Sequence, residues 1–100
     1  MTHKIDVTVS SSATSVYLES EGTVIELEST DGKTWTAVRE LDIDDTLDIV
    51  FKVRGLNGTA WSISVTIDDG YRPILKESGT ITENNYSLLK KSIPLKQKQS

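Results

Sequence analysis

The chain consists of short runs in which apolar and polar residues alternate, and this pattern constrains the fold more than any other feature. The clearest run covers residues 46–54, where Leu47, Ile49, Phe51 and Val53 hold every second position. Successive side chains of a β-strand point to opposite faces of a sheet, so this run indicates a strand with one buried face. Further runs of the same kind predict strands over residues 4–9, 16–19, 22–29, 34–40, 59–68, 79–83 and 86–95.

Turn sequences separate these runs. Asp31-Gly32, the segment 55–58 and Asn84-Asn85 contain residues that accept the backbone angles of tight turns. We therefore predict three hairpins, which pair 22–29 with 34–40, 46–54 with 59–68, and 79–83 with 86–95. The segment 69–78 breaks the alternation and contains Gly70 and Pro73, so it is predicted to be the longest loop. The segment 86–91 is the one place where a helical turn is an alternative.

Seven or eight short strands in a chain of 100 residues predict one all-β domain. We expect a sandwich of two antiparallel sheets with an immunoglobulin-like or related Greek-key topology, and a small β-barrel is the alternative. The domain is predicted to cover residues 1–95 and to leave 96–100 as a solvated tail. The strands 46–54 and 59–68 carry the most regular apolar faces, so they are expected to form the centre of the core.

Charge and composition exclude several classes of partner. The formal net charge is −4, whereas nucleic acids and anionic membranes are bound by basic surfaces. No apolar run is long enough to cross a bilayer, so we expect no membrane insertion. The chain has no cysteine and therefore no disulfide framework. These features leave the cellular compartment open.

The sequence contains no pattern typical of a catalytic site. Its one histidine is His3, near the N-terminus, and no serine lies in a Gly-x-Ser-x-Gly turn. It also lacks a zinc-binding cluster and a glycine-rich phosphate loop. Glu26 and Glu28 share a strand face, as two hydrolytic carboxylates would, but a solvated face explains them better. We therefore predict that the protein is not an enzyme.

Acidic residues at the predicted strand ends are candidate calcium ligands. A sandwich brings loops from different strands together at its two ends, and calcium prefers oxygen ligands. The spacing matches no EF-hand loop, and aspartate is also common in turns because its side chain bonds to nearby backbone. Turn formation is therefore the preferred interpretation, and we predict no obligatory cofactor. The candidate ligands are Asp42, Asp44, Asp45 and Asp69.

Three residues are candidate binding residues. Tyr71 and Arg72 lie in the predicted long loop, and both residue types are enriched where proteins contact each other. An equally good interpretation is that Tyr71 covers the end of the core and Arg72 pairs with a nearby carboxylate. Trp35 is expected to point inward, and the alternative is an outward ring on which a sugar or a partner side chain stacks.

Two functions follow from these observations. The preferred one is a non-catalytic binding or structural module, either free-standing or part of a larger assembly, that contacts protein or a second copy of itself. An edge strand, a loop, or the Ser/Thr face formed by Ser62, Ser64 and Thr66 would make the contact. The alternative is a carbohydrate-binding module, with or without calcium, that uses Trp35 or Tyr71 for stacking.

Overall fold

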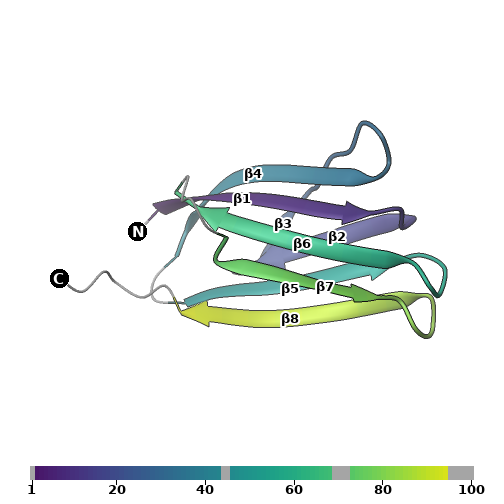
Figure 1. Cartoon of the computed structure of the whole chain (residues 1–100). Helices are drawn as coiled ribbons and strands as arrows, with labels where there is room; N and C mark the ends of the chain where they lie inside the picture. Colours follow the sequence, from purple (N-terminus) through teal and green to yellow (C-terminus); the bar gives the residue numbers. More distant parts are fainter. Residues whose placement is uncertain (1, 44–45, 69–72, 95–100) are drawn as a thin grey trace.

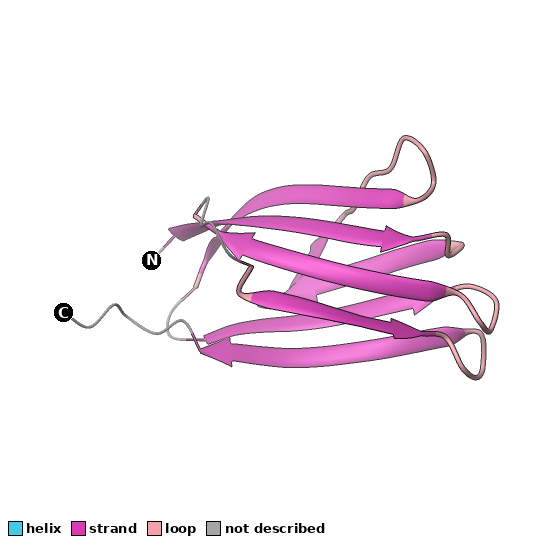
Figure 2. Cartoon of the chain, in the orientation of Figure 1, coloured by secondary structure: helices cyan, strands magenta, loops and turns pink. Residues whose placement is uncertain are grey.

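A computed structural model describes residues 2–43, 46–68 and 73–94. The described residues form strands and connecting loops, and no helix is present among them (Figure 2). The strands are β1 (Thr2–Ser11), β2 (Ser15–Ser20), β3 (Thr23–Ile25), β4 (Thr34–Asp42), β5 (Thr46–Arg54), β6 (Ala60–Ile67), β7 (Leu75–Thr80) and β8 (Tyr86–Pro94).

The strands form two antiparallel four-stranded sheets that pack against each other (Figure 1). Sheet A has the order β4-β1-β6-β7, and sheet B has the order β3-β2-β5-β8. This arrangement confirms the predicted β-sandwich and not the small barrel, because the strands belong to two separate sheets. Within the described residues there is also no helix long and apolar enough to cross a membrane.

The core lies between the sheets, and the alternation predicted its residues well. The four alternating apolar residues of β5, Leu47, Ile49, Phe51 and Val53, are buried, as are Ile5, Val7 and Val9 of β1 and Trp61, Ile63 and Val65 of β6. Phe51 and Trp61 meet across the two sheets with ring centroids 5.6 Å apart and ring planes tilted by 59°. The strands β5 and β6 therefore form the centre of the core, as predicted, although they belong to different sheets.

The three predicted hairpins are wrong. β4 pairs with β1 and not with β3, and the segment after β3 pairs with β4 through an isolated bridge between Glu28 and Thr36. β5 pairs with β2 and β8, whereas β6 pairs with β1 and β7. Each of the three turn sequences therefore carries the chain from one sheet to the other. The turn residues were identified correctly, but a turn sequence does not determine whether the next strand pairs with the previous one.

The sequence also placed some strand boundaries incorrectly. β7 begins at Leu75, inside the predicted long loop, because Leu75 is buried and the following residues pair with β6. Residues 86–91 belong to β8 and not to a helical turn. Pro94 is the last residue of β8, and β8 lies at an edge of sheet B. Both positions are expected, because proline has no backbone N–H to donate to a neighbouring strand.

The two hairpins between consecutive strands lie elsewhere. β2 and β3 are joined by Glu21 and Gly22, which both have positive φ angles, 52° and 76°. Two such residues in sequence match the twist of a two-residue hairpin. Glu21 is not a residue typical of this conformation, which explains why the sequence did not reveal the turn. β6 and β7 form the second hairpin.

Candidate functional site

The outer face of sheet B brings together side chains from three strands that are distant in the sequence. Tyr17 of β2 lies opposite Lys52 of β5, which lies opposite Leu88 of β8. In the adjacent row, Arg54 of β5 lies opposite Tyr86 of β8. Residues directly opposite each other in an antiparallel pair share a sheet face, so these five side chains form one continuous surface. We call this surface the sheet B face.

The sheet B face exposes more apolar surface than other parts of the described structure. Tyr17, Tyr86 and Leu88 are 37%, 44% and 47% exposed, and Val24 of β3, on the same face, is 50% exposed. The other large apolar residues that are exposed among the described ones are Val38, in β4, and Leu56, in the loop after β5. Grouped exposed apolar residues mark contact surfaces more often than isolated ones do.

Positive charge accompanies these apolar side chains. Lys52 and Arg54 are both exposed, although the whole chain has a net charge of −4. The Lys52 ammonium lies 5.6 Å from the centroid of the Tyr17 ring, at a distance typical of cation–π contacts. The Tyr17 hydroxyl donates a 2.8 Å hydrogen bond to the Glu19 carboxylate, and this bond raises the pKa of Tyr17. These contacts hold the Tyr17 ring in place beside the lysine.

Three hollows that are open to solvent adjoin this face, and Arg54 lines all of them. Their volumes are about 420, 350 and 420 Å³. The first is completed by the loops beside Leu56 and Asn85, the second by Tyr17 and Lys52, and the third by Tyr86. Such open hollows around a cation suit a surface contact with a partner rather than an enclosed small-molecule site.

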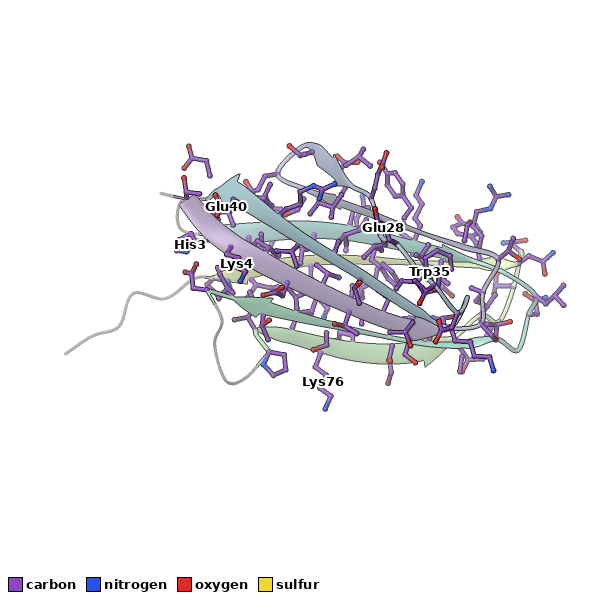
Figure 3. The ribbon with its side chains drawn as sticks, turned by 90° about the horizontal axis from the view of Figure 1, so that it is seen from above. His3, Lys4, Glu28, Trp35, Glu40 and Lys76 are labelled. Carbon is purple, nitrogen blue, oxygen red and sulfur yellow. The ribbon has the colours of Figure 1, made fainter. Side chains whose placement is uncertain are left out.

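Trp35, a predicted binding residue, lies half-buried against the core. Its indole Nε1 donates a long hydrogen bond of 3.4 Å to the backbone oxygen of Ser11. Figure 3 shows Trp35 near Glu28, at the side of the sandwich where the chain passes from sheet B to sheet A. A tryptophan held in this way offers only part of its ring to a ligand. The other two predicted binding residues, Tyr71 and Arg72, lie outside the described residues.

Of the candidate calcium ligands, only Asp42 lies within the described residues, and it ends β4. Asp44, Asp45 and Asp69 lie outside them. In the part of the chain that the structure describes, no group of three His, Cys, Asp or Glu side chains is arranged to hold a metal ion. The calcium site therefore stays a prediction from the sequence alone.

His3, the one histidine, participates in a contact between two strand ends. Its Nδ1 lies 2.6 Å from the Asp68 carboxylate, which also accepts a 3.0 Å hydrogen bond from the backbone N–H of Lys4. The hydrogen bond from His3, and then that from Lys4, lower the pKa of Asp68. This contact ties the end of β6 to the start of β1, near the end of the sandwich where Figure 3 shows His3 and Lys4.

The predicted Ser/Thr face is the outer face of sheet A. Ser62, Ser64 and Thr66 lie there, and all three are half-buried. Ser64 lies opposite Thr8 of β1, so hydroxyl residues continue across neighbouring strands. This face carries few apolar side chains, and it therefore offers less area for a stable contact than the sheet B face does.

Sequence reasoning did not identify the residues of the sheet B face as functional. The alternation in β5 does indicate that Lys52 and Arg54 point outward. Their place in a larger surface depends on Tyr17 and Leu88, which are brought to the same row only by the order β2-β5-β8.

In comparisons with known proteins, no protein-family model, no curated protein sequence and no solved structure matches this chain.

Proposed function

We propose that the protein is a non-catalytic binding module that contacts another polypeptide through the sheet B face. The single observation that carries this proposal is the grouping of Tyr17, Tyr86 and Leu88 around Lys52 and Arg54. Tyrosine and arginine are the residue types that contribute most at the centre of protein interfaces. Apolar rings provide contact area, and the two cations favour a partner with acidic groups or exposed backbone carbonyls.

Site-specific photo-crosslinking tests this proposal in cells that express the protein. A photoreactive phenylalanine derivative that replaces Tyr17 reports on the sheet B face, and the same residue at Thr8 reports on the outer face of sheet A. We expect polypeptide adducts from position 17 at a yield several-fold higher than from position 8. The adducts should also be lost when Leu88→Asp is added. Equal yields from both faces, or adducts that are insensitive to Leu88→Asp, would contradict the proposal.

A carbohydrate-binding module is the second candidate, and the exposure of two tyrosines on one sheet face favours it. Tyr17 and Tyr86 flank Lys52 and Arg54, so a sugar could stack on a ring while its hydroxyls bond to the cations. Affinity electrophoresis in gels that contain different polysaccharides tests this function. Retardation by a polysaccharide that disappears in both Tyr17→Ala and Tyr86→Ala would favour it over protein binding. A chelator added to the same gels tests for a calcium requirement.

A further inference from the structure

The strand β8 borders the sheet B face and has an open edge. The backbone N–H of Gly55 donates a 3.0 Å hydrogen bond to the oxygen of Asn85, at the start of the β5–β8 ladder. In an antiparallel ladder, the residues that bond to the neighbouring strand alternate along the chain. The odd-numbered residues of β8 therefore bond to β5, and the N–H and C=O groups of Leu88, Lys90 and Ser92 point away from it.

The other edges of the described sheets offer less to a partner strand. On the edge of β4, Thr36 exchanges two 2.9 Å backbone hydrogen bonds with Glu28, and the Val38 oxygen accepts one from the Arg39 guanidinium. β3 has three residues, and β7 has six. β8 has nine residues with no proline before its end, and its edge carries the exposed Leu88.

Lysine side chains on an edge strand usually prevent unwanted strand pairing. The exposed Lys90 disfavours the register of two antiparallel β8 strands that places Lys90 opposite Lys90. The register centred on Leu88 is favourable, because it places the two Leu88 side chains opposite each other. It also places each Lys90 opposite Tyr86 of the other copy. The molecule already holds one lysine over a tyrosine ring on this face, at Lys52 and Tyr17.

We propose that a second copy of this chain pairs antiparallel along the open edge of β8, with Leu88 on the two-fold axis. This contact goes beyond the proposed function, because Tyr17, Lys52 and Arg54 stay exposed when strand pairing extends sheet B. The contact extends the order β3-β2-β5-β8 of sheet B through the axis into the second molecule. It pairs the open edge from Tyr86 to Lys90, places the two Leu88 side chains side by side and makes two symmetric Tyr86–Lys90 contacts. An interface in which both molecules use the same surface is typical of two-fold dimers.

Single-cysteine variants test the pairing and its register, because the chain has no cysteine of its own. In the proposed register the two Leu88 Cα atoms are about 5.5 Å apart, within the range that a disulfide bridges. Under mild oxidation, we expect Leu88→Cys to form a covalent dimer. Tyr86→Cys and Lys90→Cys are matched controls on the same strand face, and their own copies lie roughly 14 Å apart. We expect them to form at least ten-fold less dimer.

Light scattering with size-exclusion chromatography measures the mass of the unmodified chain. We expect a mass that approaches twice the monomer mass as concentration rises, and a monomer for Leu88→Asp at every concentration. Val38→Asp is the control, because it places the same charge at an equally exposed apolar residue on the outer face of sheet A. Circular dichroism checks that each variant is folded.

A chain that stays monomeric at millimolar concentration would overturn the dimer, and so would preferential crosslinking through Lys90→Cys. Neither result bears on the proposed function itself, which the photo-crosslinking experiment tests separately. Tyr17 lies in β2, two strands away from the open edge, so adducts from position 17 report on the sheet B face and not on this pairing.

Discussion

Gly79 lies at the inner side of β7, against the indole ring of Trp61. A Cβ atom at Gly79 would lie 2.7 Å from Cζ2 and 3.0 Å from Cε2 of that ring. Trp61 is buried and packs on Phe51, so its ring has little room to move. We predict that Gly79→Ala lowers the free energy of unfolding by about 1–3 kcal/mol, as overpacking of a core does. Urea denaturation measures this change.

Two further variants separate this contact from a general effect on β7. Ser78→Ala changes the neighbouring exposed residue and should shift the free energy of unfolding by less than about 0.5 kcal/mol. In a Trp61→Phe background, Gly79→Ala should cost clearly less, because phenylalanine lacks the ring atoms that the new Cβ would touch. An equal cost in both backgrounds would show that the Trp61 contact is not the cause.

Alternation predicts the direction of side chains residue by residue, because it reflects a local property of extended backbone. It therefore predicts the buried residues of β1, β5 and β6. The same alternation in β5 predicts that Lys52 and Arg54 point outward, but it does not predict which side chains lie beside them. Tyr17 and Leu88 are neighbours of Lys52 only because β2 and β8 flank β5.

Turns between elements show where the sequence is ambiguous. Asp31-Gly32 has the composition of a hairpin turn, yet it connects β3 in sheet B to β4 in sheet A. The Asp31 carboxylate accepts hydrogen bonds from the backbone N–H groups of Lys33 and Thr34, at 2.8 and 2.9 Å. These local bonds stabilise the turn whichever sheet the next strand joins. Pairing is instead decided by distant contacts, which cannot be deduced from the turn itself.

The Asp31 turn makes stability depend on pH. The hydrogen bonds from Lys33 and then Thr34 lower the pKa of Asp31, so the ionised carboxylate favours the folded chain. This contribution is complete above the ordinary aspartate pKa of about 3.9 and is lost as the pH falls through the lowered value. Asp31→Asn keeps an acceptor oxygen but cannot ionise. We predict that wild type is more stable than Asp31→Asn at pH 7 and that this difference narrows as the pH falls below about 3.9.

Urea denaturation of both proteins across this pH range measures the difference directly. Asp68, whose pKa is also lowered, contributes acid sensitivity of the same sign to both proteins and therefore cancels in the comparison. A difference between the two proteins that stays constant from pH 7 to pH 2.5 would show that the Asp31 charge does not stabilise the turn.

At the scale of the whole molecule, the topology joins segments that are far apart in the chain. Ile5 of β1 lies opposite Ile67 of β6, and Thr46 of β5 lies opposite Pro94 of β8. Of the connections between consecutive strands, β2–β3 and β6–β7 are hairpins, and β3 has only three residues. Few contacts can therefore form before distant parts of the chain meet. Such topologies fold more slowly than those rich in local contacts.

We predict that the chain folds in milliseconds to seconds, as all-β domains with distant strand pairings do. Trp61 is a suitable reporter for stopped-flow fluorescence, because it packs on Phe51 of the other sheet and becomes buried only when the two sheets meet. Trp35→Phe removes the second tryptophan, so that the signal comes from Trp61 alone. Because dimerisation through β8 would add a concentration-dependent step, the Leu88→Asp variant isolates folding of the single chain. Complete folding of that variant in less than a millisecond would mean that local structure, and not the pairing of distant strands, limits the rate.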